Sequence, residues 1–181
     1  MSTLQQIAVF LVDTIFSLYI AAIVIRFLLA MVKADFYNPI SQALVTITNP
    51  TLIPLRRLIP AIGKIDTAAI VLSLILIMMK LSLLMLIING GMPGLSLIWI
   101  AVIELAQLII WIYIIAMILL AVMSWVGNTY GNPVVSILYK LTEPLLRPVR
   151  NVIPPISGLD LSPLVATMGL YIILIILNGL A

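Results

Sequence analysis

The chain has 181 residues, of which 64% are hydrophobic and 8% charged, and its formal net charge is +3 at pH 7. Because about a quarter of the residues in soluble globular proteins are charged, this composition excludes that class and predicts an integral membrane protein. The chain contains no cysteine and no histidine, which excludes disulfides, thiolate nucleophiles, histidine-ligated haem and the common zinc sites. We therefore expect no metal, no cofactor and no enzymatic activity.

Four apolar stretches are long enough to cross a hydrocarbon core of about 30 Å, which takes about 20 helical residues. They cover residues 4–32, 67–88, 95–126 and 161–180. The first stretch has no basic segment before it and is too long for a cleavable signal peptide, so we expect it to remain as a membrane helix. The sequence predicts an all-α membrane protein with four transmembrane helices.

The second half of the chain repeats the first half at an offset of 94 residues. Residues 38–71 align with residues 132–165 without a gap, and 13 of the 34 positions are identical. Few residue types suit lipid, so apolar spans resemble one another easily, but shared Asn, Pro, Arg and Asp residues in register require a true repeat. We predict two repeats, residues 1–94 and 95–181, each made of helix, loop and helix. An even number of spans makes the repeats parallel, with a pseudo-twofold axis along the membrane normal.

Basic residues gather in the two long loops, 33–66 and 127–160. Seven of the nine Lys and Arg residues lie there: Lys33, Arg56, Arg57, Lys64, Lys140, Arg147 and Arg150. The positive-inside rule places both loops in the cytoplasm and both termini outside. Since apolar residues surround the arginines, we expect all but Lys33 to bind anionic lipid headgroups. A docking surface for a cytoplasmic or membrane partner and an ion pathway are the alternatives, and nucleic acid is not expected.

Each loop begins with an Asn-Pro pair. Asn38 and Asn132 have the form of helix N-caps, each followed by proline at the first helical position. About ten residues of mixed apolar and polar character follow each pair, and then prolines recur at short intervals. Such prolines forbid a continuous helix and limit the backbone to few conformations. We therefore expect a short amphipathic helix followed by an ordered, non-helical bend.

An aspartate ends each loop immediately before the next span. Asp66 and Asp160 can accept hydrogen bonds from the first free amides of that helix and favour its positive dipole end. Ion pairs with Arg56 and Arg150 are compatible with this capping. Such pairs would close each loop on itself.

Four charged residues lie inside the predicted spans. Arg26 is about two turns from the loop end of its span, so its side chain can extend to the interface. Lys80 and Glu104 lie nine residues before and after the ends of the intervening turn, which places both about 14 Å deep and allows a buried pair. Asp13 lies at a comparable depth with no partner indicated. Gln107 holds the repeat position of Asp13 and lies on the Glu104 face.

Charge inside a membrane is costly and marks a functional site by default. Lys80 and Glu104 would nearly neutralise each other and could serve as a link between helices. A proton or cation relay is the alternative. The sequence leaves both interpretations open.

Several short motifs resemble those of the YggT family, also called YlmG. The repeated block holds Asn-Pro, then Thr-x-Pro, then Pro-x-Arg before Ile-Pro, then Asp. "YNPISQ" at residues 37–42, "PLRRLIPAIG" at residues 54–63 and "MSW" at residues 123–125 are similar to the two-repeat proteobacterial members. The resemblance covers nearly the whole chain.

This resemblance implies a bacterial inner-membrane protein with suggested roles in osmotic stress tolerance. Relatives elsewhere are linked to cell division and, in plastids, to cytochrome b6 assembly and nucleoid organisation. The resemblance carries over no catalytic residue. The second repeat has Asn151 in place of Arg57 and Gly158 in place of Lys64, so we do not expect a symmetric basic site.

Two classes of function follow. The first is a non-enzymatic scaffold or assembly factor whose ordered loops dock a partner and whose helices pack on another membrane protein. The second is a small ion channel or transporter that uses Asp13, Lys80 and Glu104, as an oligomer because four helices make a thin wall for a pore. The partner is therefore a membrane protein or further copies of this chain.

Overall fold

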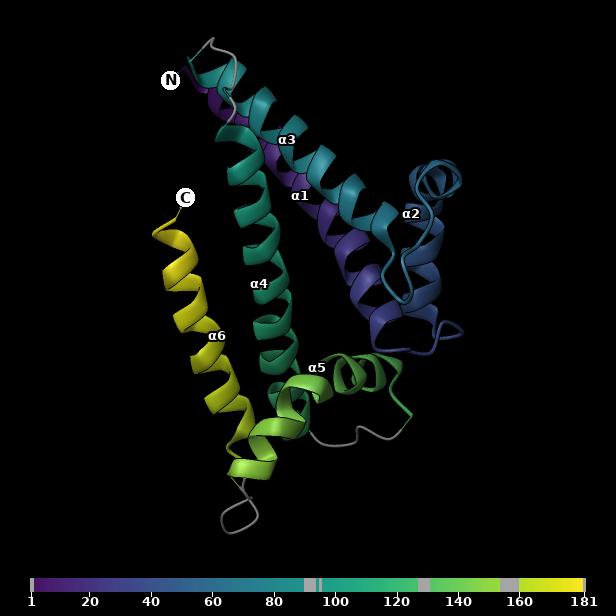
Figure 1. Cartoon of the computed structure of the whole chain (residues 1–181). Coiled ribbons are helices and arrows are strands. Elements are labelled where there is room, and N and C mark those ends of the chain that lie inside the picture. Colours follow the sequence, from purple (N-terminus) through teal and green to yellow (C-terminus); the bar gives the residue numbers. More distant parts are fainter. Residues whose placement is uncertain (1, 90–93, 95, 127–130, 154–159, 181) are drawn as a thin grey trace.

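The computed structural model describes residues 2–89, 94, 96–126, 131–153 and 160–180, and it is helical over most of them. Six helices follow one another along these residues (Figure 1): α1 Thr3–Met31, α2 Pro39–Leu58, α3 Thr67–Asn89, α4 Ser96–Val126, α5 Pro133–Val152 and α6 Ser162–Asn178. Within the described part of the chain, β pairing is limited to an isolated bridge between Ile62 and Ile65. The prediction of an all-α protein is confirmed.

Three of the helices contain segments long and apolar enough to cross a membrane, Thr3–Met31, Thr67–Ile88 and Ser96–Met123. These segments agree with the first three predicted stretches to within a few residues. The helix α6 is also apolar but has only 17 residues. At 1.5 Å per residue it is about 26 Å long, somewhat less than a hydrocarbon core of about 30 Å.

The long helices form an open row. Helices α1 and α3 pack along each other, α4 lies between this pair and α6, and α2 and α5 lie at the end remote from the chain termini (Figure 1). Among the described residues, α6 contacts α4 and α5 but neither α1 nor α3. A closed twofold arrangement of the repeats would need α6 to pack on α1 as α3 packs on α4. The packing therefore departs from a closed symmetric bundle.

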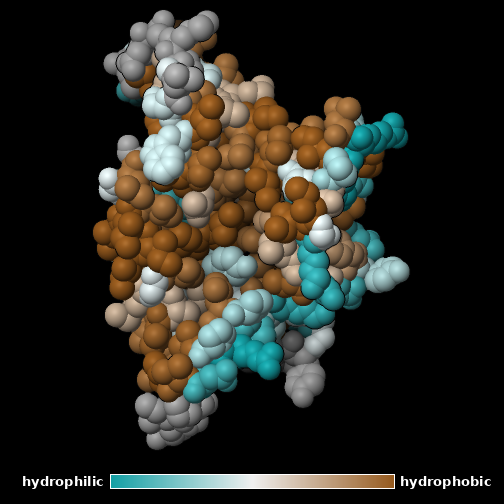
Figure 2. Space-filling view, viewed as in Figure 1, coloured by the Kyte–Doolittle hydropathy of each residue, from teal (hydrophilic) through white to brown (hydrophobic). Residues whose placement is uncertain are grey.

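Large apolar side chains point outward along the row. In α1, the exposed fraction is 69% for Leu18, 66% for Phe10 and 64% for Ile15. Figure 2 shows hydrophobic residues over most of the visible face, with hydrophilic residues gathered toward its lower and right edges. An apolar surface of this extent would make a soluble monomer associate, so it indicates that the helices lie in lipid.

One face of α2 and one face of α5 are buried against the row of long helices. Thr48 and Leu52 of α2 and their repeat counterparts Thr142 and Leu146 of α5 are completely buried. Leu52 belongs to a cluster with Ile23 of α1 and other residues of α1 and α3. The same positions of both repeats therefore anchor these helices to the spanning helices.

The prolines do not end α2 and α5, so the prediction of a short helix followed by a non-helical bend is wrong. Helix α2 continues through Pro50 and Pro54, and α5 through Pro144 and Pro148. Each pair of prolines is four residues apart on one helix face, and all four rings are exposed. Proline has no backbone N–H, so the missing helical hydrogen bonds lie on the exposed side of each helix. The contacts of the buried face hold the helix together. Helix α5 bends along its length (Figure 1), as proline-containing helices do.

We expect Leu52→Ala to lower the free energy of unfolding by about 2 to 5 kcal/mol, because it opens a cavity in a fully buried site. Thermal unfolding in detergent, followed by circular dichroism, measures the change. Ile53→Ala is the matched control, because Ile53 is the next residue and is 46% exposed. Equal losses of stability in the two variants would contradict the buried anchor.

Candidate functional site

A polar cluster joins three of the long helices. The ammonium of Lys80, on α3, contacts the Glu104 carboxylate of α4 and lies 3.4 Å from Oδ1 of Asp13 on α1. It also donates to the Ser17 hydroxyl of α1 at 3.4 Å, and that hydroxyl donates to Asp13 Oδ1 at 3.4 Å. We call these four residues the Lys80 cluster. One lysine thus links the two repeats within the apolar region.

The sequence found three members of the Lys80 cluster but not their arrangement. The structure brings Lys80 and Glu104 together as the sequence predicts, and it gives Asp13 the partner that the sequence left open. Ser17 was missed. Its signal was its position four residues after Asp13, which places both side chains on one face of α1.

The Lys80 cluster has one positive and two negative groups. The Lys80 side chain is only 7% exposed, whereas the side chains of Glu104 and Asp13 are 27% and 53% exposed. With all three groups charged, the cluster carries a net charge of −1, and its most exposed member is a carboxylate. An uncompensated carboxylate among apolar side chains is costly. The cluster can therefore accept one further positive charge next to Asp13.

A small cavity adjoins the Lys80 cluster. It has a volume of about 40 Å³ and is lined by Ser17, Lys80 and Glu104 together with apolar residues of α1, α3 and α4. One or two water molecules fit in this volume, with polar groups on one side to bind them. Water in the cavity can therefore hydrate the Lys80–Glu104 pair.

The second repeat has a neutral counterpart of the Asp13–Lys80 contact. Gln107, at the repeat position of Asp13, donates from Nε2 to Oδ1 of Asn178 at 2.9 Å. Asp13 links α1 to α3, and Gln107 links α4 to α6. In each repeat this position therefore joins the first apolar helix to the second.

The same ion pair links the end of α2 to the start of α3 and the end of α5 to the start of α6. Arg56 contacts Asp66 through Nη2 and through Nε, which lies 3.2 Å from Oδ2. Arg150 Nε lies 2.9 Å from Asp160 Oδ2, and Arg150 Nη1 lies 2.8 Å from Glu143 Oε2. The partner Glu143, absent from the first repeat, was not anticipated. Each arginine thus ties the end of its helix to the start of the next.

Both aspartates also bind backbone amides of the helix that follows. Asp66 Oδ1 accepts from the Ala69 amide at 3.3 Å, and Asp160 Oδ1 accepts from the Ser162 amide at 2.9 Å. Burial alone would raise the pKa of Asp160, but the hydrogen bonds from Ser162 and the contact with Arg150 lower it below the ordinary value. Burial likewise opposes the charge of Arg150, but Asp160 and Glu143 raise its pKa.

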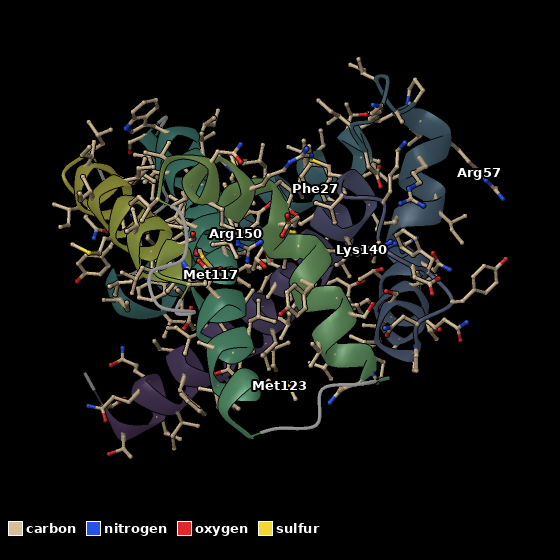
Figure 3. The ribbon with its side chains drawn as sticks, turned by 90° about the horizontal axis from the view of Figure 1, so that it is seen from below. Phe27, Arg57, Met117, Met123, Lys140 and Arg150 are labelled. Atoms are coloured by element: carbon tan, nitrogen blue, oxygen red, sulfur yellow. The ribbon has the colours of Figure 1, made fainter. Side chains whose placement is uncertain are left out.

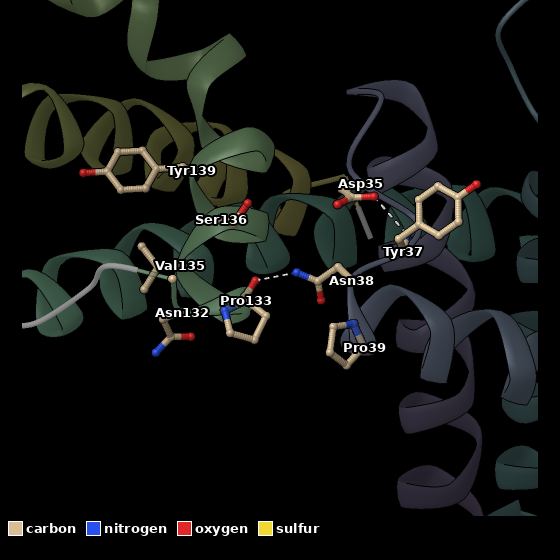
Figure 4. Close-up of a pocket in the computed structure, with 10 residues that line it drawn as sticks. Asp35, Tyr37, Asn38, Pro39, Asn132, Pro133, Val135, Ser136 and Tyr139 are labelled. Carbon is tan, nitrogen blue, oxygen red and sulfur yellow. Dashed lines mark hydrogen bonds between the residues drawn. The ribbon is translucent and has the colours of Figure 1, made fainter.

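The two asparagines cap helices and meet at a groove. Asn38 accepts from the Ile40 amide and Asn132 from the Val134 amide, both at 2.9 Å. Asn38 Nδ2 also donates to the Pro133 carbonyl at 2.8 Å, which joins the starts of α2 and α5 (Figure 4). An open groove of about 690 Å³ lies there, lined by both Asn-Pro pairs with Asp35, Tyr37, Gly131, Val135, Ser136 and Tyr139.

The remaining basic residues differ in whether they contact another group of the chain. Arg57, Lys64 and Arg147 are exposed and make no ion pair among the described residues, and Arg57 points away from the helices (Figure 3). Lys140 Nζ lies 3.5 Å from the Lys33 carbonyl. Lys64 follows Gly63, whose φ of +62° suits the tight turn there. Gly158, the counterpart of Lys64, lies outside the described residues.

Arg26 extends to α2 and is covered by that helix. Its side chain is buried, with 7% of the residue exposed, and Nη1 donates to the Thr48 hydroxyl at 2.6 Å. That hydroxyl donates in turn to the Leu44 carbonyl. The packing of α2 over α1 covers the arginine, and the sequence alone did not show that contact.

Comparison with known proteins gives consistent matches along the chain. The CCB3/YggT family model matches residues 5–87 and again residues 99–181. An uncharacterised protein of Pseudomonas aeruginosa is 37% identical in an alignment 182 positions long, which covers 98% of this chain and 92% of the relative. An uncharacterised protein of Vibrio alginolyticus is 38% identical over 167 residues, covering 89% and 88%. YggT of Escherichia coli K12 is 36% identical over 169 residues, covering 91% and 85%. No solved structure matches.

We expect Lys80→Met to destabilise the protein by about 3 to 5 kcal/mol, because it leaves two carboxylates without their shared cation. Glu104→Gln should cost about 1 kcal/mol, because Asp13 remains as a counterion for Lys80. Thermal unfolding in lipid nanodiscs gives the order of stability. Combining Lys80→Met with Asp13→Asn and Glu104→Gln should recover most of the loss, and a triple variant no better than Lys80→Met would contradict the pairing.

We expect Asp160 to make stability sensitive to acid. Its pKa in the folded protein lies below the ordinary value of 3.8, so its contribution is complete above that value and disappears as the pH falls through the folded-state pKa. Melting temperatures of the wild type and Asp160→Asn, measured between pH 7 and pH 3, should differ by about 1 to 3 °C near neutrality. The two curves should approach each other as the pH falls below about 3.8, and parallel curves would exclude this linkage.

Proposed function

The chain belongs to the CCB3/YggT family, and from that premise we propose that it is a non-enzymatic scaffold or accessory protein of a bacterial inner membrane. The ion pairs that link successive helices in both repeats carry this proposal. The Arg56–Asp66 pair and the Arg150–Asp160 pair have the same ten-residue spacing in both repeats. A link to osmotic stress tolerance or to division, implied by the family resemblance, belongs to the same proposal.

In the proposed topology α6 is the fourth span, so each repeat crosses the membrane twice. Its 17 residues lie at the short end of the range for spanning helices. The chain termini lie at the end of the row remote from α2 and α5 (Figure 1), as an even number of spans requires. The positive-inside rule then places α2, α5 and their basic side chains on the cytoplasmic side.

We place α2 and α5 at the lipid interface with one face on the row. Leu58 at the end of α2 and its counterpart Val152 in α5 are each 80% exposed. Each lies within two residues of an arginine, Arg56 or Arg150. A side-chain pattern of this kind suits acyl chains on one side and anionic headgroups on the other.

A pre-ordered loop is better suited to binding than a flexible one. Binding to a flexible segment must first restrict its backbone, which costs about 1 to 2 kcal/mol per residue. Here the ion pairs and helix caps hold the segment before any partner arrives, so less of the binding energy is lost to ordering. The exposed Arg57, Lys64 and Arg147 are available for contact, since the internal pairs use Arg56 and Arg150.

A small oligomeric channel or transporter is the second candidate. The Lys80 cluster and its cavity favour it, because they place charges and room for water inside the apolar row. The cavity has a volume of about 40 Å³ and is lined by both Lys80 and Glu104. It holds no more than a few waters, which is too little for a continuous ion path across the row. The scaffold therefore remains the better supported function.

We expect the combined change Arg57→Gln, Lys64→Gln and Arg147→Gln to reduce a co-purifying protein partner at least fivefold. The tagged protein would be purified from its own membranes in mild detergent, and partners would be quantified by proteomics and native mass spectrometry. Lys33→Gln is a control that removes a positive charge elsewhere in the first loop. Membrane insertion should be unchanged in all variants.

Two results would contradict the scaffold. One is purification of the wild type with lipid alone, as a monomer or a homo-oligomer. The other is equal loss of the partner in the Lys33→Gln control, since this would show a general effect of charge. In the first case, ion flux in liposomes with the Lys80→Met variant becomes the decisive assay for the channel.

A further inference from the structure

We propose that the side of α1 carrying Asp13 docks a transmembrane helix of a partner protein, and that this helix presents a lysine or arginine at mid-membrane depth. The inference rests on the proposed function, because it assumes a protein partner within the membrane. It names the surface used and the chemistry of the partner.

The docking surface is a stripe along α1. Gln6, Phe10 and Asp13 follow one another at intervals of four and three residues, which places them on one face of a helix. All three are exposed, with values of 66% for Phe10 and 53% for the Asp13 side chain. Ser17, four residues further along, binds Asp13. The stripe therefore combines a large apolar side chain with a carboxylate at the same surface.

The charge of the Lys80 cluster indicates what this surface binds. Lys80 makes its closest contact with Glu104, and its ammonium lies 3.4 Å from Asp13. Counted as formal charges, one cation faces two carboxylates, so the cluster has one negative charge more than positive, and Asp13 is the more exposed carboxylate. A basic side chain from a neighbouring helix would complete the neutralisation, and interhelical polar contacts in lipid stabilise association.

The depth of Asp13 excludes a lipid headgroup as the natural counterion. Asp13 is ten residues from the start of α1 at Thr3, which is about 15 Å along the helix axis. This is near the middle of a 30 Å core. Lysine and arginine can extend from such a depth to the interface, but the short side chain of aspartate cannot.

A second copy of the chain is a poor match for the same surface. Only two basic residues, Arg26 and Lys80, lie in the apolar spans, and both are buried at 7% and 6% exposure. A second copy meeting this surface face to face would bring another Asp13 to it, and two carboxylates repel each other. The charge complement must therefore come from a different protein.

A defined peptide tests the inference without knowledge of the natural partner. The wild type, labelled with a fluorescence donor, would be placed in liposomes with an acceptor-labelled helix of about 22 leucine and alanine residues that carries one central lysine. A peptide with leucine at that position is the matched probe. Energy transfer at a series of peptide-to-lipid ratios gives the relative affinities.

We expect the lysine peptide to bind the wild type about tenfold more tightly than the leucine peptide. Asp13→Asn should abolish this preference and Asp13→Glu should retain it. Gln107→Leu removes a polar group at the corresponding position of the second repeat and should leave the preference intact. Size-exclusion profiles and melting temperatures would show that the variants remain folded.

Three outcomes would overturn the inference. Equal binding of the two peptides by the wild type is sufficient by itself, whatever the variants do. So is an unchanged preference in folded Asp13→Asn. Energy transfer between differently labelled copies of the wild type, lost on Asp13→Asn, would show instead that this surface joins two copies of the chain.

A photo-crosslinking amino acid at Phe10 separates this inference from the scaffold proposal. In native membranes, an adduct on an apolar segment of the co-purifying partner, next to a lysine or arginine, supports the inference. A partner that co-purifies but is not crosslinked there leaves the scaffold intact and excludes the α1 stripe. If no partner co-purifies, the scaffold fails, and the peptide assay still decides the binding preference of Asp13.

Discussion

The contact of one buried ammonium with two carboxylates is the constraint on which the rest of the architecture depends. Lys80 lies between α1 and α4 and binds Asp13 and Glu104, so it fixes the rotation of three helices about their axes. Apolar packing alone is tolerant of such rotations, because leucine and isoleucine fit against many neighbours and lipid competes for the same faces. A charged group in a low dielectric does not tolerate such rotations, because every rotation that separates it from its counterions has a large cost in free energy. The pairing of α3 with α4, which joins the two repeats, is therefore specific.

At the other end of the row the same kind of contact has a different effect. The Arg56–Asp66 and Arg150–Asp160 pairs are partly exposed, and ion pairs of this kind contribute little to stability. Their effect is on order, because each arginine connects a helix end to an aspartate that also caps the next helix. In both repeats the end of one helix is thereby tied to the start of the next, while Arg57 and Arg147 stay exposed. A loop that only connected two helices would need neither the ion pair nor the capping aspartate.

Much of this could be predicted from residue patterns, wherever the physics is local. The lengths of the apolar runs located three spanning segments, the Asn-Pro pairs located the starts of α2 and α5, and equal distances from a turn brought Lys80 to Glu104. The failures share one cause. The partner of Asp13, the burial of Arg26 under Thr48 and the continuation of α2 through Pro50 all depend on how separate helices pack, and no pattern within one helix reports that. Proline disfavours the interior of a helix, but at Pro50 this cost is outweighed by the packing of the fully buried Leu52 two residues later.

The comparison between the repeats shows that the Lys80 cluster is more than a structural link. In the second repeat, the contact at the equivalent position is made by Gln107 and Asn178, two neutral amides. An amide pair therefore suffices to join the first apolar helix of a repeat to the second, and it does so without placing charge in lipid. The first repeat uses Asp13 and Lys80 for the same geometric task, and Lys80 also contacts Glu104 of the second repeat. This arrangement has a higher desolvation cost and one carboxylate more than it has cations. Lys80 already has Glu104 as its nearest counterion, so the charge of Asp13 is more than the pairing of Lys80 needs, and such a surplus charge is where a specific partner is best sought.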